Sequence, residues 1–323
     1  MSVPNLSEIA TSTIDARSGI VADNVTHNNP FLTYVKKRGG IKTCDGGDNI
    51  NEEISFAENG NAGWYSGMDA LPVGQSDVIS SAQFQWKQLA AAVVISGLDR
   101  MKNKGEAKIL DLLDARMEVA ENTLANFVET GLYGDGTSYS GKSLTGLDLA
   151  VPTDPTTGTY GGIDRASWTF WRSQIQSDAG APSSTTIQGR MTSLYAKCVR
   201  GTDFPDLIIL SQTYWSTFIA SLQAIQRFID VDKANMGFKT ATFLQADVVL
   251  GGGLGGAETD TNGTGYFLNT KYFKFRPHTD RNFTALDPEK RYAVNQDAMV
   301  VLIGFMGNAT CRGAQFCGRM IHT

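Results

Sequence analysis

Residues 136 to 143 read GTSYSGKS, which matches the nucleotide-binding loop pattern G-x-x-x-x-G-K-S/T letter for letter. In such a loop, backbone N–H groups surround the phosphates, the lysine reaches the outer phosphates and the serine hydroxyl binds magnesium. Lys142 and Ser143 would take these two roles here. The chemistry also requires a strand that leads into the loop and a helix that begins directly after it.

Neither flank of this string suits a phosphate site. The preceding residues are the end of a predicted long helix, with apolar side chains three and four apart from residue 109 to residue 128. The following residues include Gly146, Pro152 and Pro155, which oppose a helix that begins at Lys142. We therefore predict a solvated turn at 136–143, and a P-loop nucleotide hydrolase remains the alternative from a different functional class.

A second glycine-rich string, GGGLGG at 251–256, contains the dinucleotide-binding pattern G-x-G-x-x-G. It follows the strand-like residues ADVVL, but AETDTNGTG comes next in place of the helix that would hold a pyrophosphate. This composition predicts a flexible loop.

Residues for catalysis or metal binding are scattered. Of the three histidines, His27 lies in a polar segment and His322 is penultimate, so only His278 suits a Ser–His–acid site, and a strand-end surface histidine is favoured. No two cysteines have C-x-x-C spacing, which opposes a zinc site and favours reduced, structural thiols. They are Cys44, Cys198, Cys311 and Cys317.

Two further clusters favour a structural interpretation. Four carboxylates surround a predicted strand with a spacing that matches no calcium loop, so we expect a solvated face. They are Asp45, Asp48, Glu52 and Glu53. An aromatic group lacks the basic surroundings of a nucleic-acid site and favours core or interface packing. It consists of Trp168, Phe170 and Trp171. We predict no enzyme, no catalytic residue, no metal and no cofactor.

The 323 residues suffice for one large or two ordinary domains, with 41% hydrophobic and 19% charged residues. A net charge of −5 does not favour broad electrostatic binding of nucleic acid. The N-terminal residues lack the basic start and apolar core of a signal peptide. The longest near-apolar stretch, 89–95, is far shorter than the roughly 20 residues of a membrane span. We expect a soluble protein.

The pattern along the chain predicts an α+β fold. Residues 1–42 are polar and predict an extended arm with little core of its own. Strands at 49–57 and 77–88 flank a glycine-rich turn that carries Trp64 and Tyr65, so they form a long hairpin that needs a partner surface. A helix of about seven turns starts at Glu106 and ends near Gly131 or Gly134.

Beyond the helix, the pattern alternates. Residues 185–201 and 213–229 are helical, and 205–211 and 240–250 are strand-like, which predicts helices around a sheet. Further strands are expected at 266–278, 291–311 and 313–321.

This order of elements resembles the major capsid proteins of tailed bacteriophages with the Hong Kong 97-type fold. The stretches that carry the resemblance are GLYGDGTSYSGKSLTGLDLAV, YGGIDRASWTFWRSQI and KYFKFRPHTDRNFTALDPEKRYAVNQDAMVVLIGFMGN. It covers nearly the whole chain from about residue 28, and its specificity lies in the order of structural motifs.

The resemblance implies a division into named segments. Residues 1–44 would form an N-terminal arm and 45–88 an extended loop. A peripheral domain would hold a long spine helix in 89–145 and the returning strands in 271–323, and an axial domain would occupy 146–270.

The function implied is a major capsid protein that self-assembles into pentamers and hexamers of an icosahedral virion shell enclosing double-stranded DNA, without sequence-specific binding. Its localisation would be the virion capsid, assembled in the host cytoplasm, with a scaffolding protein, a portal and a cement protein as further partners. No long scaffold-like helical segment leads the chain, so a separate scaffolding protein helps assembly or such a segment has been removed. The alternative of the same fold is an encapsulin-like nanocompartment shell protein.

Interface residues follow from the hairpin and the arm. We expect the exposed aromatic residues of the hairpin to pack on an adjacent subunit. We expect the basic residues of the arm to form ion pairs with acidic residues of the loop. The expected set is Lys36, Lys37, Arg38, Glu52, Glu53, Trp64, Tyr65 and Asp69. Some relatives cross-link covalently through a lysine of the extended loop, but this chain has no lysine between Lys42 and Lys87. We therefore predict non-covalent cohesion.

Overall fold

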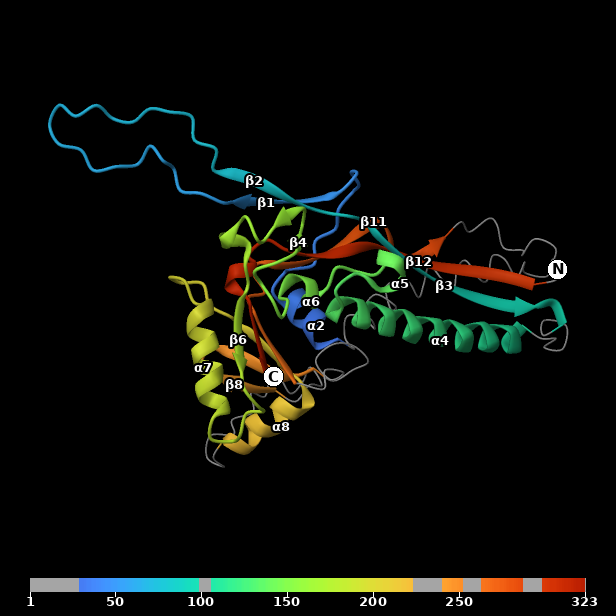
Figure 1. Ribbon diagram of the computed structural model, residues 1–323. Coiled ribbons are helices and arrows are strands. Elements are labelled where there is room, and N and C mark those ends of the chain that lie inside the picture. The colour runs from blue at the N-terminus through green and yellow to red at the C-terminus, as the bar shows by residue number, and fades with distance from the viewer. Residues whose placement is uncertain (1–28, 99–105, 223–239, 252–262, 287–297, 323) are drawn as a thin grey trace.

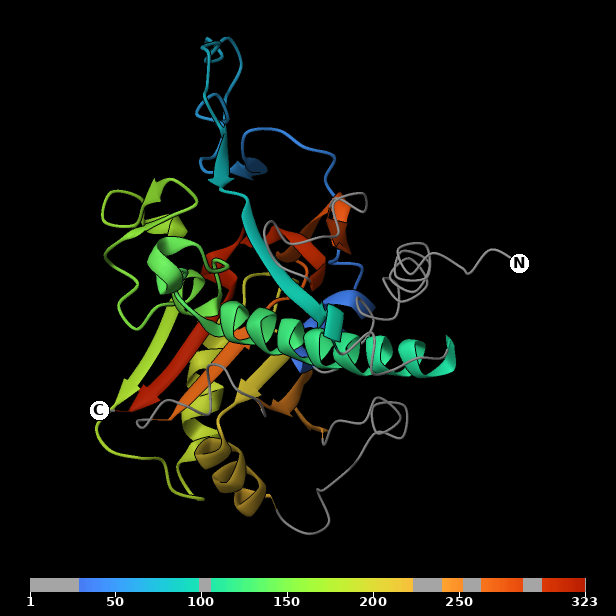
Figure 2. The ribbon, with the colours of Figure 1, turned by 90° about the vertical axis from the view of Figure 1, so that its right-hand side faces the viewer.

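The computed structural model describes residues 29–98, 106–222, 240–251, 263–286 and 298–322, and the side chains of 30, 106–114, 240 and 299 are not described. An elongated unit that contains the helix α4 extends to one side of a second unit built around a six-stranded sheet (Figure 1). A long loop between β1 and β2 projects from the top (Figures 1 and 2). This mixture confirms the predicted α+β class.

The elongated unit is a three-stranded antiparallel sheet with a helix beside it. The strand order is β11 (Phe273–Leu286), β12 (Ala298–Cys311) and β3 (Lys87–Ser96), and α4 (Glu106–Tyr133) runs along β3. Met117, Leu124 and Val128 of the predicted apolar stripe are buried, while Phe127 is 40% exposed. The start and length of the predicted helix are therefore confirmed.

The second unit holds a sheet of order β6-β13-β10-β7-β9-β8. Its strands are β6 (Gln174–Asp178), β13 (Gly318–His322), β10 (Thr264–Leu268), β7 (Leu207–Leu210), β9 (Ala246–Leu250) and β8 (Thr240–Phe243). The helices α7 (Ile187–Cys198) and α8 (Gln212–Ser221) pack on this sheet and bury Leu194 and Phe218 (Figure 1).

Two sequence predictions need correction here. Residues 313–321 were expected among the returning strands of the peripheral domain, yet β13 lies between β6 and β10 in the six-stranded sheet, parallel to β6. The strand predicted at 240–250 is a hairpin of β8 and β9, because Leu244 adopts a positive φ of 54° that reverses the chain. Both outcomes depend on long-range pairing.

The expectation of an arm without core is wrong for residues 30–37. This segment is the helix α2 (Pro30–Lys37), whose start is capped by the Asn29 side chain, which accepts a hydrogen bond from Leu32 N at 3.1 Å. Phe31 and Val35 are buried, and the Phe31 ring meets Phe273 of β11 edge-on at 5.4 Å. The helix therefore belongs to the core. Residues 1–28 of the predicted arm lie outside the described residues.

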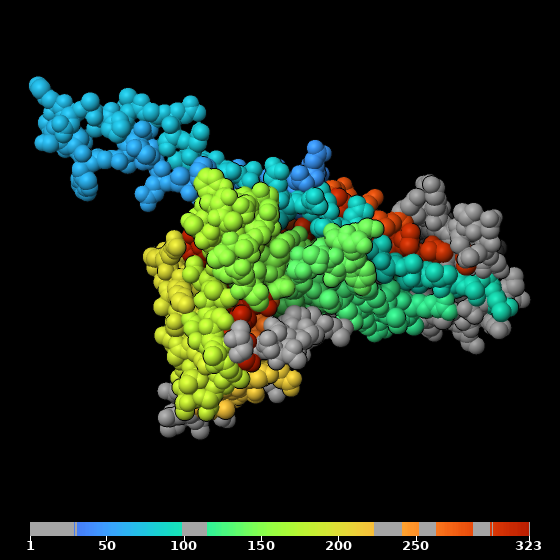
Figure 3. Space-filling model, viewed as in Figure 1, coloured from blue at the N-terminus to red at the C-terminus, as the bar shows by residue number. Residues whose placement is uncertain are grey.

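The predicted hairpin is confirmed. The strands β1 (Ile50–Ser55) and β2 (Ile79–Phe84) pair antiparallel, with Ile50 opposite Phe84 and Ser55 opposite Ile79. Residues 56–78 continue beyond them and form the part of the extended loop that projects from the body of the chain (Figure 3). Asn61 and Gly74 join its two sides through paired hydrogen bonds.

Short elements connect the two units. They are α5 (Ser138–Gly141), α6 (Leu147–Ala150), β4 (Thr159–Tyr160), β5 (Ile163–Asp164), η1 (Thr169–Trp171) and η4 (Ala314–Phe316). Among the described residues, no helix is long and apolar enough to cross a membrane.

Candidate assembly surfaces

The string 136–143 forms a closed turn. Gly141 N donates to Thr137 O at 2.9 Å and Ser143 N donates to Ser138 O at 3.2 Å, so these N–H groups are engaged within the turn. The helix α4 precedes the string, and no helix begins at Lys142, because α5 ends at Gly141 and α6 starts at Leu147. Both requirements of a phosphate loop fail, which confirms the predicted turn.

The second glycine string follows β9 as predicted, but 252–262 lies outside the described residues. His278 is half-buried, its ring lies 5.5 Å from that of Trp86, and its Nδ1 accepts from Asp280 N at 3.1 Å. His27 lies outside the described residues, while Nδ1 of His322 lies 2.9 Å from the Tyr214 hydroxyl. These contacts favour a structural role for His278 and His322, the two histidines that the structure describes.

The cysteines are free thiols. Cys198, Cys311 and Cys317 are buried, and burial raises the pKa of Cys198 to about 12. A hydrogen bond with Cys311, together with burial, also raises the pKa of Cys317. Both thiols therefore stay protonated at neutral pH. Cys44, in contrast, is only half-buried.

Glu52 does not lie on a solvated face, so this prediction is wrong. β1 alternates buried and exposed positions, which places Glu52 with Ile50 and Ile54 on the inner side. The Glu52 carboxylate accepts from Arg276 Nε at 2.7 Å and Thr310 Oγ1 at 2.9 Å. Burial raises the pKa of this carboxyl, but the hydrogen bonds of Arg276 and Thr310 and the charges of Arg276 and Lys274 together outweigh it, and the pKa lies below its ordinary value.

This network fixes the base of the extended loop to β11 and β12, and the Lys274 ammonium completes it at 3.7 Å from Glu52 Oε2. Glu52 is therefore engaged within its own chain, and we do not retain it among the residues that meet a neighbour. The sequence contains a signal for this outcome, since Glu52 shares the alternating face of Ile50 and Ile54.

The other expected interface residues lie at the surface, in two separate places. Lys36, Lys37 and Arg38 are exposed at the end of α2, where Arg38 Nε lies 3.8 Å from the Asp206 carboxylate. Glu53 is exposed on β1, and Trp64, Tyr65 and Asp69 are exposed in the loop between β1 and β2. The Asp69 carboxylate accepts from Ser66 N at 2.9 Å. The structure does not bring the two groups together within one chain.

The extended loop combines exposed apolar side chains with charge of one sign. Its large exposed apolar residues are Trp64, Tyr65, Met68, Leu71 and Val73. Residues 43–86 contain no lysine, arginine or histidine, yet they carry acidic residues at 45, 48, 52, 53, 58, 69 and 77. The missing lysine was noted from the sequence, but the absence of every cation, which is visible in the same letters, was not.

The aromatic group at 168–171 packs on the base of the loop. The ring of Phe56 lies 5.6 Å from that of Trp168 and 6.2 Å from that of Phe170. Trp171 is fully buried, and its Nε1 donates to Tyr160 O at 2.9 Å. Packing in the core is therefore confirmed for Trp171, while Trp168 stays 47% exposed beside the loop.

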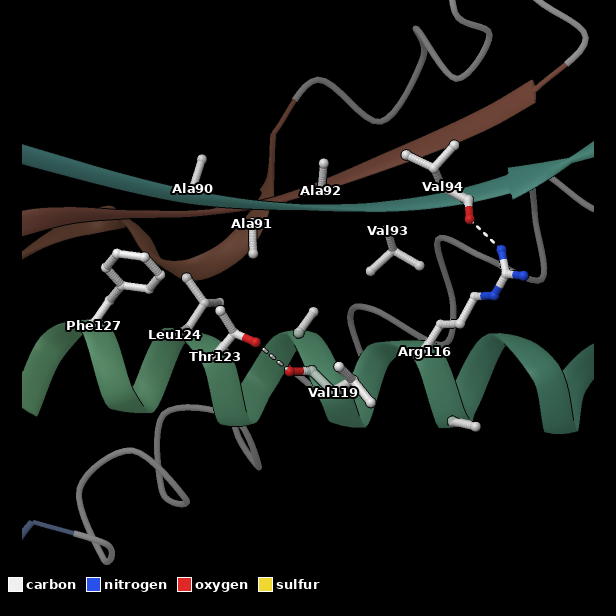
Figure 4. Close-up of a pocket in the computed structure, with 12 residues that line it drawn as sticks. Ala90, Ala91, Ala92, Val93, Val94, Arg116, Val119, Thr123, Leu124 and Phe127 are labelled. Atoms are coloured by element: carbon white, nitrogen blue, oxygen red, sulfur yellow. Dashed lines mark hydrogen bonds between the residues drawn. The ribbon is translucent and has the colours of Figure 1, made fainter. Parts of the chain in front are cut away.

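A groove between β3 and α4 was missed by sequence reasoning. Figure 4 shows Ala91 and Val93 of β3 pointing toward Leu124 and Val119 of α4. This hollow measures about 510 Å³ and adjoins a second of about 790 Å³ that extends to the 136–143 turn, since both are lined by Ala90 and Phe127. No local sequence pattern predicts this groove, because the groove depends on the distance between β3 and α4.

No family model and no curated protein matches the sequence. Solved structures do match. The chain is similar to the capsid of cyanophage A-1(L), with 16% identity, a TM-score of 0.68, and 90% and 91% of the two chains covered. It is similar to the capsid of an empty GTA particle, with 13% identity, a TM-score of 0.59, and 88% and 89% covered.

A third match is the capsid of the Myoviridae phage XM1, with 14% identity, a TM-score of 0.54, and 89% and 91% of the two chains covered. The matches cover about nine tenths of this chain, at identities that establish architecture alone. This chain therefore has the Hong Kong 97-type fold of tailed-phage capsid proteins.

Proposed function

We propose that this chain is a major capsid protein that self-assembles into pentamers and hexamers of an icosahedral virion shell around double-stranded DNA. The observation that carries the proposal is the match to phage capsids over about 90% of both chains. Within it, the segment boundaries predicted from the sequence stand as a proposal, except that β13 joins the axial sheet.

The extended loop supplies a physical reason for assembly. In an isolated chain, Trp64, Met68 and Val73 are fully or almost fully exposed at the end of a hairpin that has no surface of its own to cover them. Burial of one such side chain contributes about 1.5–3 kcal/mol. A neighbouring copy that covers the loop gains this energy, and a closed symmetric shell repeats the contact at every subunit.

The further partners belong to the same proposal. A scaffolding protein, a portal and a cement protein would join the shell, which would form in the host cytoplasm and hold DNA without sequence-specific contacts. Nuclease treatment of intact particles tests the content. Protected double-stranded DNA supports a virion, whereas protein cargo without DNA would identify a nanocompartment shell.

The central test is assembly of the purified chain, alone and with a co-expressed scaffolding protein from the same genome. Sedimentation and negative-stain electron microscopy should show closed shells built from this chain. A protein that remains monomeric at high concentration under both conditions would contradict the proposal.

A further inference from the structure

The extended loop carries an Asn-Gly pair, Asn59-Gly60, to which the proposed function gives no role. Both residues are exposed on the part of the loop that projects from the body of the chain (Figure 3). Because glycine has no Cβ atom, its backbone nitrogen is open to close approach by a neighbouring group. That group here is the Asn59 carboxamide, whose carbon is an electrophile. The pair therefore combines a nitrogen nucleophile and an electrophilic carbon within one turn.

A turn orients the carboxamide. Ala62 N donates to Asn59 O at 3.1 Å, which closes a β-turn over residues 59–62. Within this turn, Asn61 N donates to Asn59 Oδ1 at 3.0 Å. The ring that this hydrogen bond closes contains both Asn59 Cγ and the Gly60 nitrogen, which limits how far apart the two atoms can move. The same N–H polarises the carbonyl and faces the oxygen on which negative charge develops when a nucleophile adds to Cγ.

The proton of the Gly60 nitrogen has an acceptor on the opposite side of the loop. Gly60 N donates to Ser76 Oγ at 3.4 Å, and Ser76 is half-buried. Asn61 holds the two sides of the loop in this register, because its side chain accepts from Gly74 N at 3.0 Å and donates to Gly74 O. The Ser76 hydroxyl can therefore take the Gly60 proton and release its own proton to water.

We propose that Asn59 is a site of self-modification, at which the Gly60 nitrogen displaces the side-chain amide. The bond between Gly60 N and Asn59 Cγ forms, and the bond between Cγ and Nδ2 of Asn59 breaks. The amide leaves as ammonia, which carries the equivalent of the proton that Gly60 loses, and a cyclic imide remains. Water then opens this ring at one of its carbonyl carbons and gives either aspartate or isoaspartate. No group is oxidised or reduced, and water is the only co-reactant.

The nearby Asn61 is the internal contrast. It is followed by Ala62, whose Cβ hinders attack by the backbone nitrogen, and both the oxygen and the nitrogen of its carboxamide are engaged with Gly74. The other Asn-Gly pair of the chain is at 262–263, and residue 262 lies outside the described residues. Within the loop, modification is therefore expected at Asn59 and not at Asn61.

The modification changes both the charge and the backbone of the loop. Residues 43–86 contain acidic side chains and no lysine, arginine or histidine, so a new carboxylate at position 59, next to Glu58, adds to charge of one sign. Isoaspartate also routes the main chain through the side-chain carbon and lengthens it by one methylene. The reaction requires one chain and water, so it does not depend on the proposed function.

Peptide mass spectrometry of the purified, folded chain during prolonged incubation tests the reaction. In water enriched in heavy oxygen, the peptide that contains residue 59 should gain one labelled oxygen. Chromatography should separate its aspartate and isoaspartate forms, while Asn61 in the same peptide stays an amide. An Asn59 amide that is lost no faster than the Asn61 amide, or that gives aspartate without isoaspartate, would overturn the proposal.

Two variants and a control connect the rate to the geometry. No atom lies within 4 Å of a Cβ built at Gly60, and its φ is outside the left-handed region, so Gly60→Ala should keep the turn. It should nevertheless slow the reaction about tenfold, because the added Cβ hinders the nitrogen. Ser76→Ala removes the proton acceptor and should slow the reaction about two- to fivefold. Ser66→Ala, at an exposed serine of the same loop, should leave the rate unchanged. Equal rates in the wild type and all three variants would overturn the proposal.

Discussion

At the scale of single residues, the most consequential group is Glu52. Two cations and one hydroxyl converge on its buried carboxylate, from strands more than two hundred positions away in sequence. A buried ion pair contributes little compared with a well-packed apolar pair, but removal of one partner leaves an uncompensated charge. The attachment of the hairpin to β11 and β12 therefore depends on the Glu52 side chain.

Glu52→Ala should lower the free energy of unfolding of the isolated subunit by about 3 kcal/mol, since Arg276 and Lys274 would be left without their carboxylate. Chemical denaturation of the unassembled chain measures this. The matched control is Glu53→Ala, whose side chain is exposed on the same strand and whose change should stay within about 0.5 kcal/mol. Similar losses for both variants would refute the central role of the network.

The same carboxyl predicts a pH dependence. The pKa of Glu52 is lower in the folded chain than its ordinary value of 4.5, so its stabilisation is present above pH 4.5 and is lost as the pH falls through the folded pKa. The difference in unfolding free energy between the wild type and Glu52→Gln should accordingly shrink below pH 4.5. A difference that stays constant down to acid unfolding would exclude this titration.

At the scale of elements, the end of α4 depends on a close approach of two backbones. A Cβ atom at Gly146, just before α6, would lie 2.4–2.5 Å from the carbonyl oxygens of Leu132, Gly131 and Gly134. Backbone atoms cannot yield as a flexible side chain can, so the junction between the spine helix and the rest of the chain admits only glycine.

Gly146→Ala should therefore destabilise the subunit by about 1–3 kcal/mol, through displacement of the last turn of α4. Gly189 inside α7 provides the contrast, because no atom lies within 4 Å of a Cβ built there. Gly189→Ala should stabilise the chain by about 0.5–1 kcal/mol, since alanine is the better helix former. Thermal unfolding of the two variants measures both signs, and a stable Gly146→Ala protein would contradict the steric argument.

We expect the contribution of the extended loop to assembly to be separable from its contribution to folding. Replacement of both Trp64 and Tyr65 by serine should leave the melting temperature of the unassembled subunit unchanged, because neither aromatic residue is buried in the chain. The same variant should assemble poorly, as measured by sedimentation of shells, since its apolar contact with a neighbour is lost. Val199→Ser, at an exposed apolar residue of the other unit, is the control. Normal yields of stable shells from the double variant would count against the role of the loop.

At the scale of the whole molecule, we expect cohesion between copies to come from many weak contacts. The loop lacks the lysine through which some relatives cross-link, and exposed ion pairs contribute about 0–1 kcal/mol each. Repetition over a closed shell makes such contacts sufficient.

Mature particles boiled with reductant should therefore give one band on a denaturing gel, near the chain mass of 34.9 kDa. The Cys198 and Cys317 thiols, kept protonated by their raised pKa, do not offer a substitute nucleophile. A ladder of covalent multimers would show that another nucleophile outside the loop replaces the lysine.

The sequence by itself determined the elements whose signals are local. The spacing of Met117, Leu124 and Val128 predicted α4, alternation predicted the hairpin, and Gly146, Pro152 and Pro155 excluded a phosphate loop. Their order along the chain was sufficient for the fold, because this fold is recognised by the succession of its parts.

Only the tertiary structure decided the outcomes that depend on distant residues. Glu52 is buried because Arg276 and Thr310 form hydrogen bonds with it, and β13 belongs to the six-stranded sheet because it pairs with β6 and β10. The groove exists because α4 lies beside the edge strand β3. Local periodicity predicts none of these three features, since each depends on contacts between residues that are distant in sequence and that folding brings together.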